Sequence, residues 1–214
     1  MAEGLREQKK ARTRRQITEA AFELFAADGF DQVSVAAVAR RAQVSEATVF
    51  NYFRTKEDLV FDPLDAYESG LVEAVRDRPA GTSVAVALGA YLARRSGLLG
   101  SDDPAARARL VAANRMVASS PHLLARERQI YEEHARALAD ALAREVGTDP
   151  HDIRPMVVAT ALIGVQRALV DFVRGQVMSG RAGPELARRV ARQTERALAL
   201  LDAGLANYPG PAAG

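Results

Sequence analysis

The sequence predicts an all-α protein with a small N-terminal head and a larger C-terminal helical bundle. The 214 residues include 42 alanines, and 26 of the 29 basic residues are arginine. Alanine and arginine both favour helices. The strand-forming aromatic residues are few, with five tyrosines, seven phenylalanines and no tryptophan. No segment alternates polar and apolar residues as a half-buried strand would. Helix caps and breakers instead divide the chain into about nine helical segments.

Residues 1–12 are expected to form a basic arm, and residues 13–58 a head of three helices. The first helix is expected to begin at Thr13 or Arg14 and to end at Gly29, which suits a C-cap. Its apolar residues recur with helical spacing, at Ile17, Ala20, Ala21, Leu24 and Phe25. Ser34 and Ser45 are expected to cap the second and third helices. These two helices would bury Val38, Ala39, Ala42, Val49 and Phe53.

Residues 59–208 are expected to form the bundle, and residues 209–214 a disordered tail. The fourth helix is expected from Lys56 to Arg78, with an interruption and a kink at Pro63. Ser83, Asp103 and Ser120 are expected to cap the next three helices, the last two with proline at the first helical position. Asp152 is expected to open an eighth helix that runs to about Met178. Pro184 is expected to start a last helix that runs to about Asn207.

Several classes of protein are disfavoured by the composition and motifs. The absence of cysteine excludes a disulfide scaffold, a thiolate zinc site and a cysteine nucleophile. The chain lacks a nucleophile elbow, a phosphate-binding loop, a dinucleotide fingerprint and an H-E-x-x-H motif, so we expect no enzyme, cofactor or metal. The run from Met156 to Val165 is short of the roughly 20 apolar residues that span a bilayer. The charged N-terminus has no apolar signal segment, so a soluble cytoplasmic protein is expected.

Positive charge is concentrated at the N-terminus. The net charge of the whole chain is +2, and six basic residues fall within the first 15 positions: Arg6, Lys9, Lys10, Arg12, Arg14 and Arg15. Such a segment can neutralise DNA phosphates and release counterions, with Arg12 and Arg14 as the expected contacts. A solvated terminus without a ligand is the alternative reading.

The segments Ser34–Ala42 and Ser45–Phe53, joined by a tight turn, form a helix-turn-helix candidate. In such motifs the second helix enters the major groove. Asn51 could pair with adenine, Glu46 could accept from cytosine, and Ala47 could contact a thymine methyl. Phosphate contacts are expected from Thr48, Tyr52 and Lys56 and from the helix N-termini at Ser34 and Ser45. The alternative is a plain three-helix subdomain whose polar face is only solvated.

The stretch SVAAVARRAQVSEATVFNYFRTKEDL, residues 34–59, resembles the DNA-binding head of the tetracycline-repressor-like (TetR/AcrR) transcriptional regulators. The preceding AFELFAADGF, residues 21–30, resembles the first helix of that family. Two positions depart from the family pattern. Gln43 replaces the usual turn glycine and would be modestly strained at positive φ. Phe50 stands where a tyrosine hydroxyl commonly meets a phosphate, and its ring is expected only to pack.

The resemblance implies a homodimeric repressor that a small-molecule effector releases from a near-palindromic operator. The last two helices of the chain would form the dimer interface. Their apolar positions could equally belong to the core of a single subunit; these positions are Val158, Ala161, Leu162, Val165, Leu169, Phe172, Leu186, Val190, Ala197, Leu198 and Leu201. The effector, expected to be lipophilic or aromatic, would meet Tyr67, Tyr91, Asn114, Arg115, Gln166 and Phe172. A buried Arg167 would pair with Asp171. The fourth helix would transmit the signal. A regulator without a small-molecule ligand, or an activator, is the alternative.

Overall fold

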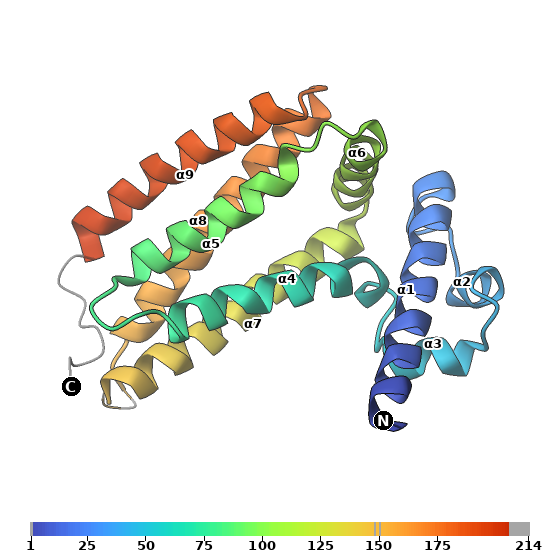
Figure 1. The fold of residues 1–214 in the computed structure, drawn as a ribbon, viewed down its shortest axis with the longest axis horizontal. Helices are drawn as coiled ribbons and strands as arrows, with labels where there is room; N and C mark the ends of the chain where they lie inside the picture. Colours follow the sequence, from blue (N-terminus) through green and yellow to red (C-terminus); the bar gives the residue numbers. More distant parts are fainter. Residues whose placement is uncertain (1, 148, 150, 206–214) are drawn as a thin grey trace. The chain divides into compact units, whose positions relative to one another are not determined.

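The computed structural model describes residues 2–147, 149 and 151–205, except the side chains of residues 2–5, 62–69, 95–98, 202, 203 and 205. All regular structure in these residues is helical, which confirms the predicted fold class (Figure 1). The helices are α1 (Ala2–Asp28), α2 (Val35–Arg41), α3 (Glu46–Tyr52), α4 (Asp58–Arg76), α5 (Val84–Leu99), α6 (Pro104–Ser119), α7 (Pro121–Val146), α8 (Arg154–Met178) and α9 (Pro184–Leu205). The tail predicted at 209–214 lies outside the described residues.

The chain divides into two compact units whose boundaries differ from the sequence expectation. The first unit combines Met1–Ala66 with Arg115–Glu127, and the second combines Tyr67–Asn114 with Arg128–Gly214. The head is therefore larger than residues 13–58, because it also includes the start of α4 and the junction between α6 and α7. Helices α4, α6 and α7 each continue from one unit into the other.

The first unit is built around α1, which packs on α2, while α2 packs on α3. Ile17, Ala21 and Phe25 of α1 are almost completely buried, as the helical periodicity predicts. The two short helices also have buried residues, Val38, Ala39 and Val49. Gln16 of α1 also donates a hydrogen bond of 2.7 Å from Nε2 to the carbonyl of Ala42. Helix α1 is thus joined to α2 by packing and by this hydrogen bond.

The expected start of the first helix at Thr13 or Arg14 is wrong, because α1 begins at Ala2. Glu, Gln, Lys, Arg and Ala dominate residues 2–12, and these residue types have high helix propensity. The basic segment therefore extends α1 instead of forming a separate irregular arm.

In the second unit α9 packs along α5 and α8 (Figure 1). The main core contains Leu88, Leu138, Leu142, Val158 and Leu162, with further apolar residues of α4, α5, α7 and α8 around them. The approach of α5 to α9 is close at Gly89, where a Cβ would lie 2.7 Å from Cδ1 of Leu198. A smaller cluster joins Val177 of α8 to Leu186 and Val190 of α9.

Most predicted helix caps are confirmed. The Ser83 hydroxyl accepts a hydrogen bond from Val86 N, the Asp103 carboxylate accepts from Ala105 N, and the Ser120 hydroxyl accepts from Leu123 N. Gly29 has φ of +85° just after α1, as a C-cap requires.

Two helix boundaries differ from prediction. Helix α4 begins at Asp58 and continues without interruption past Pro63, because one proline removes a single backbone donor while the flanking turns persist. Helix α8 begins at Arg154, after an N-cap at Ile153 that makes no side-chain hydrogen bond. Asp152 instead accepts a hydrogen bond from Arg154 N just outside the cap.

Candidate functional site

The two short helices of the first unit have the geometry of a helix-turn-helix. The Ser34 hydroxyl accepts a hydrogen bond from Ala37 N at the start of α2. The Ser45 hydroxyl accepts one from Thr48 N at the start of α3. Between the helices Gln43 has φ of +55°, so the strain expected where a glycine is usual is present. Val44 N closes the turn by donating to the Ala39 carbonyl at 3.0 Å.

The outer face of α3 is exposed at the positions expected to read bases. Glu46, Ala47 and Asn51 are all exposed, whereas Val49 is buried against the rest of the unit. None of the three exposed side chains is needed for packing, so all three are available to a ligand. The structure thus brings the predicted base-reading residues together on one surface.

Phe50 also lies on this exposed face. Its side chain is 52% exposed, so the expectation that the ring only packs is wrong. The reason is helical geometry: Val49 already occupies the inner position of α3, and the next residue points about 100° away from it.

Thr48 and Tyr52, predicted to contact phosphates, are half-buried on the flank of α3. The Thr48 hydroxyl lies 2.8 Å from the Ser45 hydroxyl, so the cap residue orients it. Both residues border the surface that contains Asn51.

Lys56 has partners inside the unit. Its ammonium donates to the Phe30 carbonyl and lies 4.3 Å from the centre of the Phe30 ring. Burial lowers the pKa of this lysine, and the carboxylates of Asp31 and Glu57 act in the opposite direction. Lys56 therefore closes the turn after α1, a structural contact that its sequence position did not reveal.

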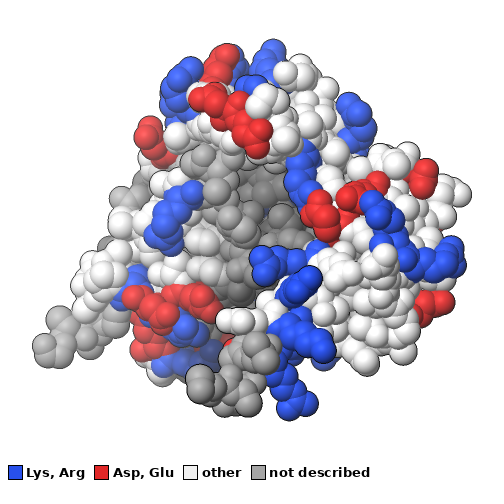
Figure 2. All heavy atoms as spheres, turned by 45° about the vertical axis from the view of Figure 1, so that its right-hand side comes forward, with Lys and Arg blue, Asp and Glu red and all other residues white. Residues whose placement is uncertain are grey.

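The basic residues of α1 divide into two groups. Arg6, Lys9, Lys10, Arg12 and Arg15 are exposed, and Lys and Arg side chains gather over the N-terminal half of α1 (Figure 2). Arg14 is partly buried, with its guanidinium 5.1 Å from the centre of the Phe53 ring. The exposed group provides positive charge within the same unit as α3.

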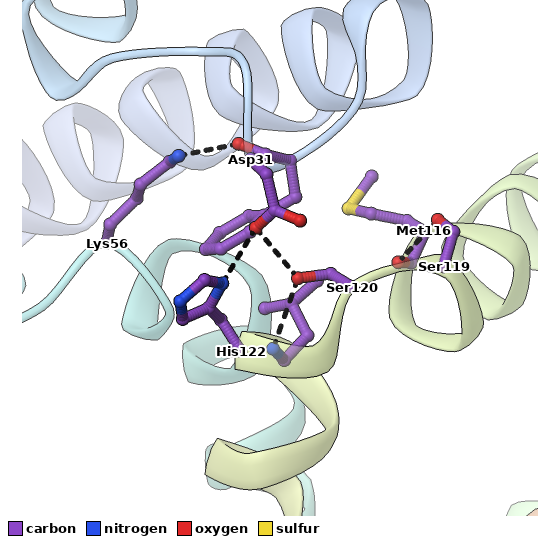
Figure 3. A network of polar contacts seen from close by, with 8 residues as sticks. Asp31, Lys56, Met116, Ser119, Ser120 and His122 are labelled. Atoms are coloured by element: carbon purple, nitrogen blue, oxygen red, sulfur yellow. Dashed lines mark hydrogen bonds and ion pairs between the residues drawn. The ribbon is translucent and has the colours of Figure 1, made fainter.

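The junction of α6 and α7 contributes a polar cluster that sequence reasoning missed (Figure 3). One oxygen of the Asp31 carboxylate accepts a hydrogen bond of 3.0 Å from the Ser120 hydroxyl and lies 3.1 Å from Nδ1 of His122. Arg126 adds a longer contact of 3.4 Å to the Asp58 carboxylate. No local pattern links residues about 90 positions apart, although the capping signal at Ser120 was visible.

The residues expected to contact an effector fall in different environments. Tyr91 is buried in the main core of the second unit, and Phe172 packs against the smaller cluster. Asn114 donates from its amide to the Leu110 carbonyl. Arg115 is exposed and belongs to the first unit. The side chain of Tyr67 lies outside the described residues.

Gln166 is the most unusual of these candidates. It is 1% exposed, and neither its amide oxygen nor its amide nitrogen has a hydrogen-bond partner among the residues that the structure describes. A buried amide without a partner costs about 1–3 kcal/mol per group, so native proteins rarely retain one. The neighbouring Arg167 is exposed, and Asp171 pairs with Arg174 instead. The predicted pair between Arg167 and Asp171 is therefore wrong.

Of the eleven apolar positions of α8 and α9 considered for a dimer interface, five are buried and six are half-buried. Val158, Leu162, Leu169, Leu186 and Val190 are buried inside the subunit. The exposed face of α8 instead contains Val157, Thr160, Gly164 and Ala168, and Leu200 of α9 is 79% exposed. Both faces of α8 are apolar or small, so the dimer interface stays a prediction.

By length and mean hydropathy α8 is the one helix in the described part of the chain that could cross a membrane. The sequence predicts no such segment, because the apolar run from Met156 to Val165 is short. Eight of the 25 residues of α8 are buried in the subunit, Gln166 among them. Among the described residues, no group of three or more His, Asp or Glu side chains could hold a metal ion.

Comparisons with known proteins agree with this geometry. A family model described as bacterial regulatory proteins, tetR family, matches residues 17–62, and a model described as the MftR C-terminal domain matches residues 99–206. The HTH-type transcriptional regulator TcmR of Streptomyces glaucescens is 33% identical over 172 residues, which cover 78% of this chain and 75% of TcmR.

Two solved structures share the fold at 20% identity. One is NalD, the secondary repressor of the MexAB-OprM multidrug efflux pump in Pseudomonas aeruginosa, with a TM-score of 0.56 over 88% of this chain and 96% of NalD. The other is FadR from Bacillus subtilis in complex with stearoyl-CoA, with a TM-score of 0.52 over 89% of this chain and 98% of FadR. Together with the helix-turn-helix of the first unit, the family models and the identity to TcmR show that this chain belongs to the TetR family of bacterial transcriptional regulators.

Proposed function

We propose that the protein is a cytoplasmic, homodimeric repressor that binds a near-palindromic operator and is released by a small lipophilic or aromatic effector. The observation that carries the DNA-binding part is the exposed face of α3, which projects Glu46, Ala47 and Asn51 away from a helix fixed by Val49 and the Ser45 cap. An α-helix fits the major groove, and these side-chain types match cytosine, thymine and adenine.

The remaining site residues are proposed to contact the DNA backbone. Arg12 and Arg14 on α1, Thr48 and Tyr52 on α3, the hydroxyls of Ser34 and Ser45, and Lys56 belong to the same unit as the base-reading face. Lys56 has further N–H donors besides the one that Phe30 accepts. Backbone contacts of this kind set the position and affinity but not the sequence preference.

Fluorescence anisotropy with DNA from upstream of the protein's own gene tests this assignment. We expect saturable binding that survives a scrambled competitor and weakens with salt. Asn51→Ala should relax base preference, whereas Lys56→Met should weaken binding to all sequences and reduce the salt slope by about one. Gln129→Ala, on the exposed surface of α7, is the control. If both site variants bind as the control does, α3 is not the reading helix.

The homodimer is proposed to form through the exposed face of α8 together with α9. Val157, Thr160, Gly164 and Ala168 recur every three or four residues and form one small-residue stripe, and nothing lies within 4 Å of the position a Cβ would take on Gly164. Such a surface allows α8 of a second copy to pack closely against α8 of the first. Two-fold symmetry would then present two copies of α3 to two half-sites.

The effector is proposed to bind in the second unit next to Gln166. The surrounding core is apolar, so the unpaired amide offers one donor and one acceptor in an otherwise lipophilic setting. FadR, with the same fold, was solved with stearoyl-CoA, which supports a large apolar ligand in this fold. The polar anchor of such a ligand would satisfy the amide.

Thermal unfolding with stearoyl-CoA and a panel of planar aromatic compounds tests this site. A ligand that binds only the native state raises the stability of that state. If the ligand lowers the affinity for operator DNA by a certain factor, saturating operator DNA should lower the affinity for the ligand by the same factor. Gln166→Leu should stabilise the free protein by about 1–3 kcal/mol and should remove the response to the ligand. Gln193→Leu, on a half-buried position of α9, is the control. Ligand affinity that operator DNA leaves unchanged would contradict the release mechanism.

A further inference from the structure

Phe50 is an exposed aromatic residue on α3, the proposed recognition helix. Among the described large hydrophobic side chains that are exposed, it is the only one in the first unit and the only aromatic one. The inner side of α3 is filled by Val49, and the buried ring of Phe53 follows the helix. The fold of the unit therefore does not require a ring at position 50.

The neighbours of Phe50 place it within the base-reading surface. Ala47 lies three residues before it and Asn51 directly after it, and both are exposed. Residues three apart on a helix are surface neighbours, so Ala47 and Phe50 form one apolar edge beside the amide of Asn51. A phenylalanine ring has no hydroxyl to donate to a phosphate, so a polar backbone contact does not explain it.

The major groove offers one apolar feature on its base edges, which is the C5 methyl group of thymine. We propose that Phe50, flanked by Ala47, recognises a thymine methyl in each operator half-site and is a specificity-determining residue. This inference rests on the proposed function, because it requires α3 to enter the groove. Covering the methyl and the ring removes apolar surface of both from water.

The position of Asn51 adds a prediction about the sequence that is read. An asparagine amide pairs with the N6 and N7 positions of adenine, and the adjacent ring covers a methyl. The two side chains together select A·T pairs at the same or neighbouring positions. The half-site should therefore contain a fixed thymine close to the adenine that depends on Asn51.

The experiment is selection from a random duplex library prepared either with dTTP or with dUTP, because deoxyuridine keeps the hydrogen-bonding edge of thymine and lacks the methyl. Wild-type protein should enrich a fixed thymine in the dTTP library, and this preference should disappear in the dUTP library while the adenine preference remains. On the selected duplex, one dT→dU replacement should weaken wild-type binding about fourfold, as expected for one buried methyl group.

The Phe50→Ala variant completes the test. It should fold as wild type, since the ring is half-exposed, and should be insensitive to the same dT→dU replacement. A second thymine of the duplex outside the motif is the control for the DNA. If Phe50→Ala retains wild-type sensitivity to the methyl, or if wild type enriches a motif equally well from both libraries, the inference is overturned. If no motif is enriched from either library, the proposed sequence-specific function fails as well.

Discussion

The Asp31 carboxylate, in the turn after α1, accepts a hydrogen bond of 3.0 Å from the hydroxyl of Ser120, which is 89 residues later in the chain. Ser120 is 2% exposed and its hydroxyl also accepts from Leu123 N at the start of α7. One hydroxyl thus caps a helix and attaches it to the turn that precedes the helix-turn-helix. This contact explains why Arg115–Glu127 belongs to the same compact unit as the head.

Replacing Asp31 should loosen this attachment. We expect Asp31→Ala to lower the free energy of unfolding by about 1–2 kcal/mol, because the buried Ser120 hydroxyl loses its acceptor. Hydrogen exchange of residues 116–124 should rise together with this loss. Asp28→Ala, an exposed carboxylate at the end of α1, is the control. Equal stability of the two variants would show that the contact contributes nothing.

The ion pair between Arg78 and Glu145 should be the most sensitive polar contact of the second unit. The Arg78 side chain is 2% exposed and donates to both Glu145 oxygens and to the carbonyls of Val75 and Thr82. Removing one partner of a buried pair leaves the other charge without compensation. Arg78→Met should therefore cost about 3–5 kcal/mol.

Urea denaturation measures this effect, and Arg76→Met is its matched control. The pair between Arg76 and Asp77 is exposed, so its loss should cost less than about 1 kcal/mol. A similar effect of the two variants would contradict the importance assigned to burial.

The turn between α2 and α3 should be stabilised by glycine. Gln43 has φ of +55°, a conformation that is unfavourable for a residue with a Cβ and favourable for glycine. We expect Gln43→Gly to raise the free energy of unfolding by about 0.5–1 kcal/mol. The same change at Gln129, inside α7, should lower it by about 1 kcal/mol. Destabilisation at both positions would show that Gln43 makes compensating contacts.

Substitutions of Ser45 should separate the stability of α3 from its DNA affinity. Ser45→Ala removes the cap and should cost about 1 kcal/mol, whereas Ser45→Asn and Ser45→Asp both retain a capping oxygen. The added negative charge of Ser45→Asp should nevertheless weaken DNA binding strongly, because it faces phosphates in the proposed complex. Thermal unfolding and anisotropy measure the two properties. Normal DNA binding by Ser45→Asp would place this helix end away from the DNA.

A charge on the small-residue stripe of α8 should prevent dimerisation without unfolding the subunit. The space around Gly164 is open, and arginine has a higher helix propensity than glycine. We expect Gly164→Arg to be a folded monomer in light scattering after gel filtration, and Ala137→Arg on the exposed side of α7 to remain a dimer. A dimeric Gly164→Arg variant would exclude this face as the interface.

The sequence by itself predicted each helix seen in residues 2–147 and 151–205 from local signals. Serine, aspartate and proline at helix starts, glycine at helix ends, and an apolar residue every three or four positions act within one or two turns. They were sufficient for the caps at Ser34, Ser45 and Ser120 and for the buried stripe of α1. They also predicted a reading face of α3 that is exposed in the structure, because burial of Val49 fixes the opposite side.

Only the tertiary structure decided which of several equivalent faces is covered and which distant residues meet. Helix α8 is apolar or small on both faces, so periodicity could not distinguish the buried Val158 from the exposed Val157. Lys56, which was predicted to contact a phosphate, donates a hydrogen bond to the Phe30 carbonyl. Asp31 accepts a hydrogen bond from Ser120, which is 89 residues later in the chain. Phe50 remains exposed because Val49 already occupies the inner position. The physical reason is common to all: local propensity sets where helices begin and end, whereas burial depends on packing among segments far apart in the chain.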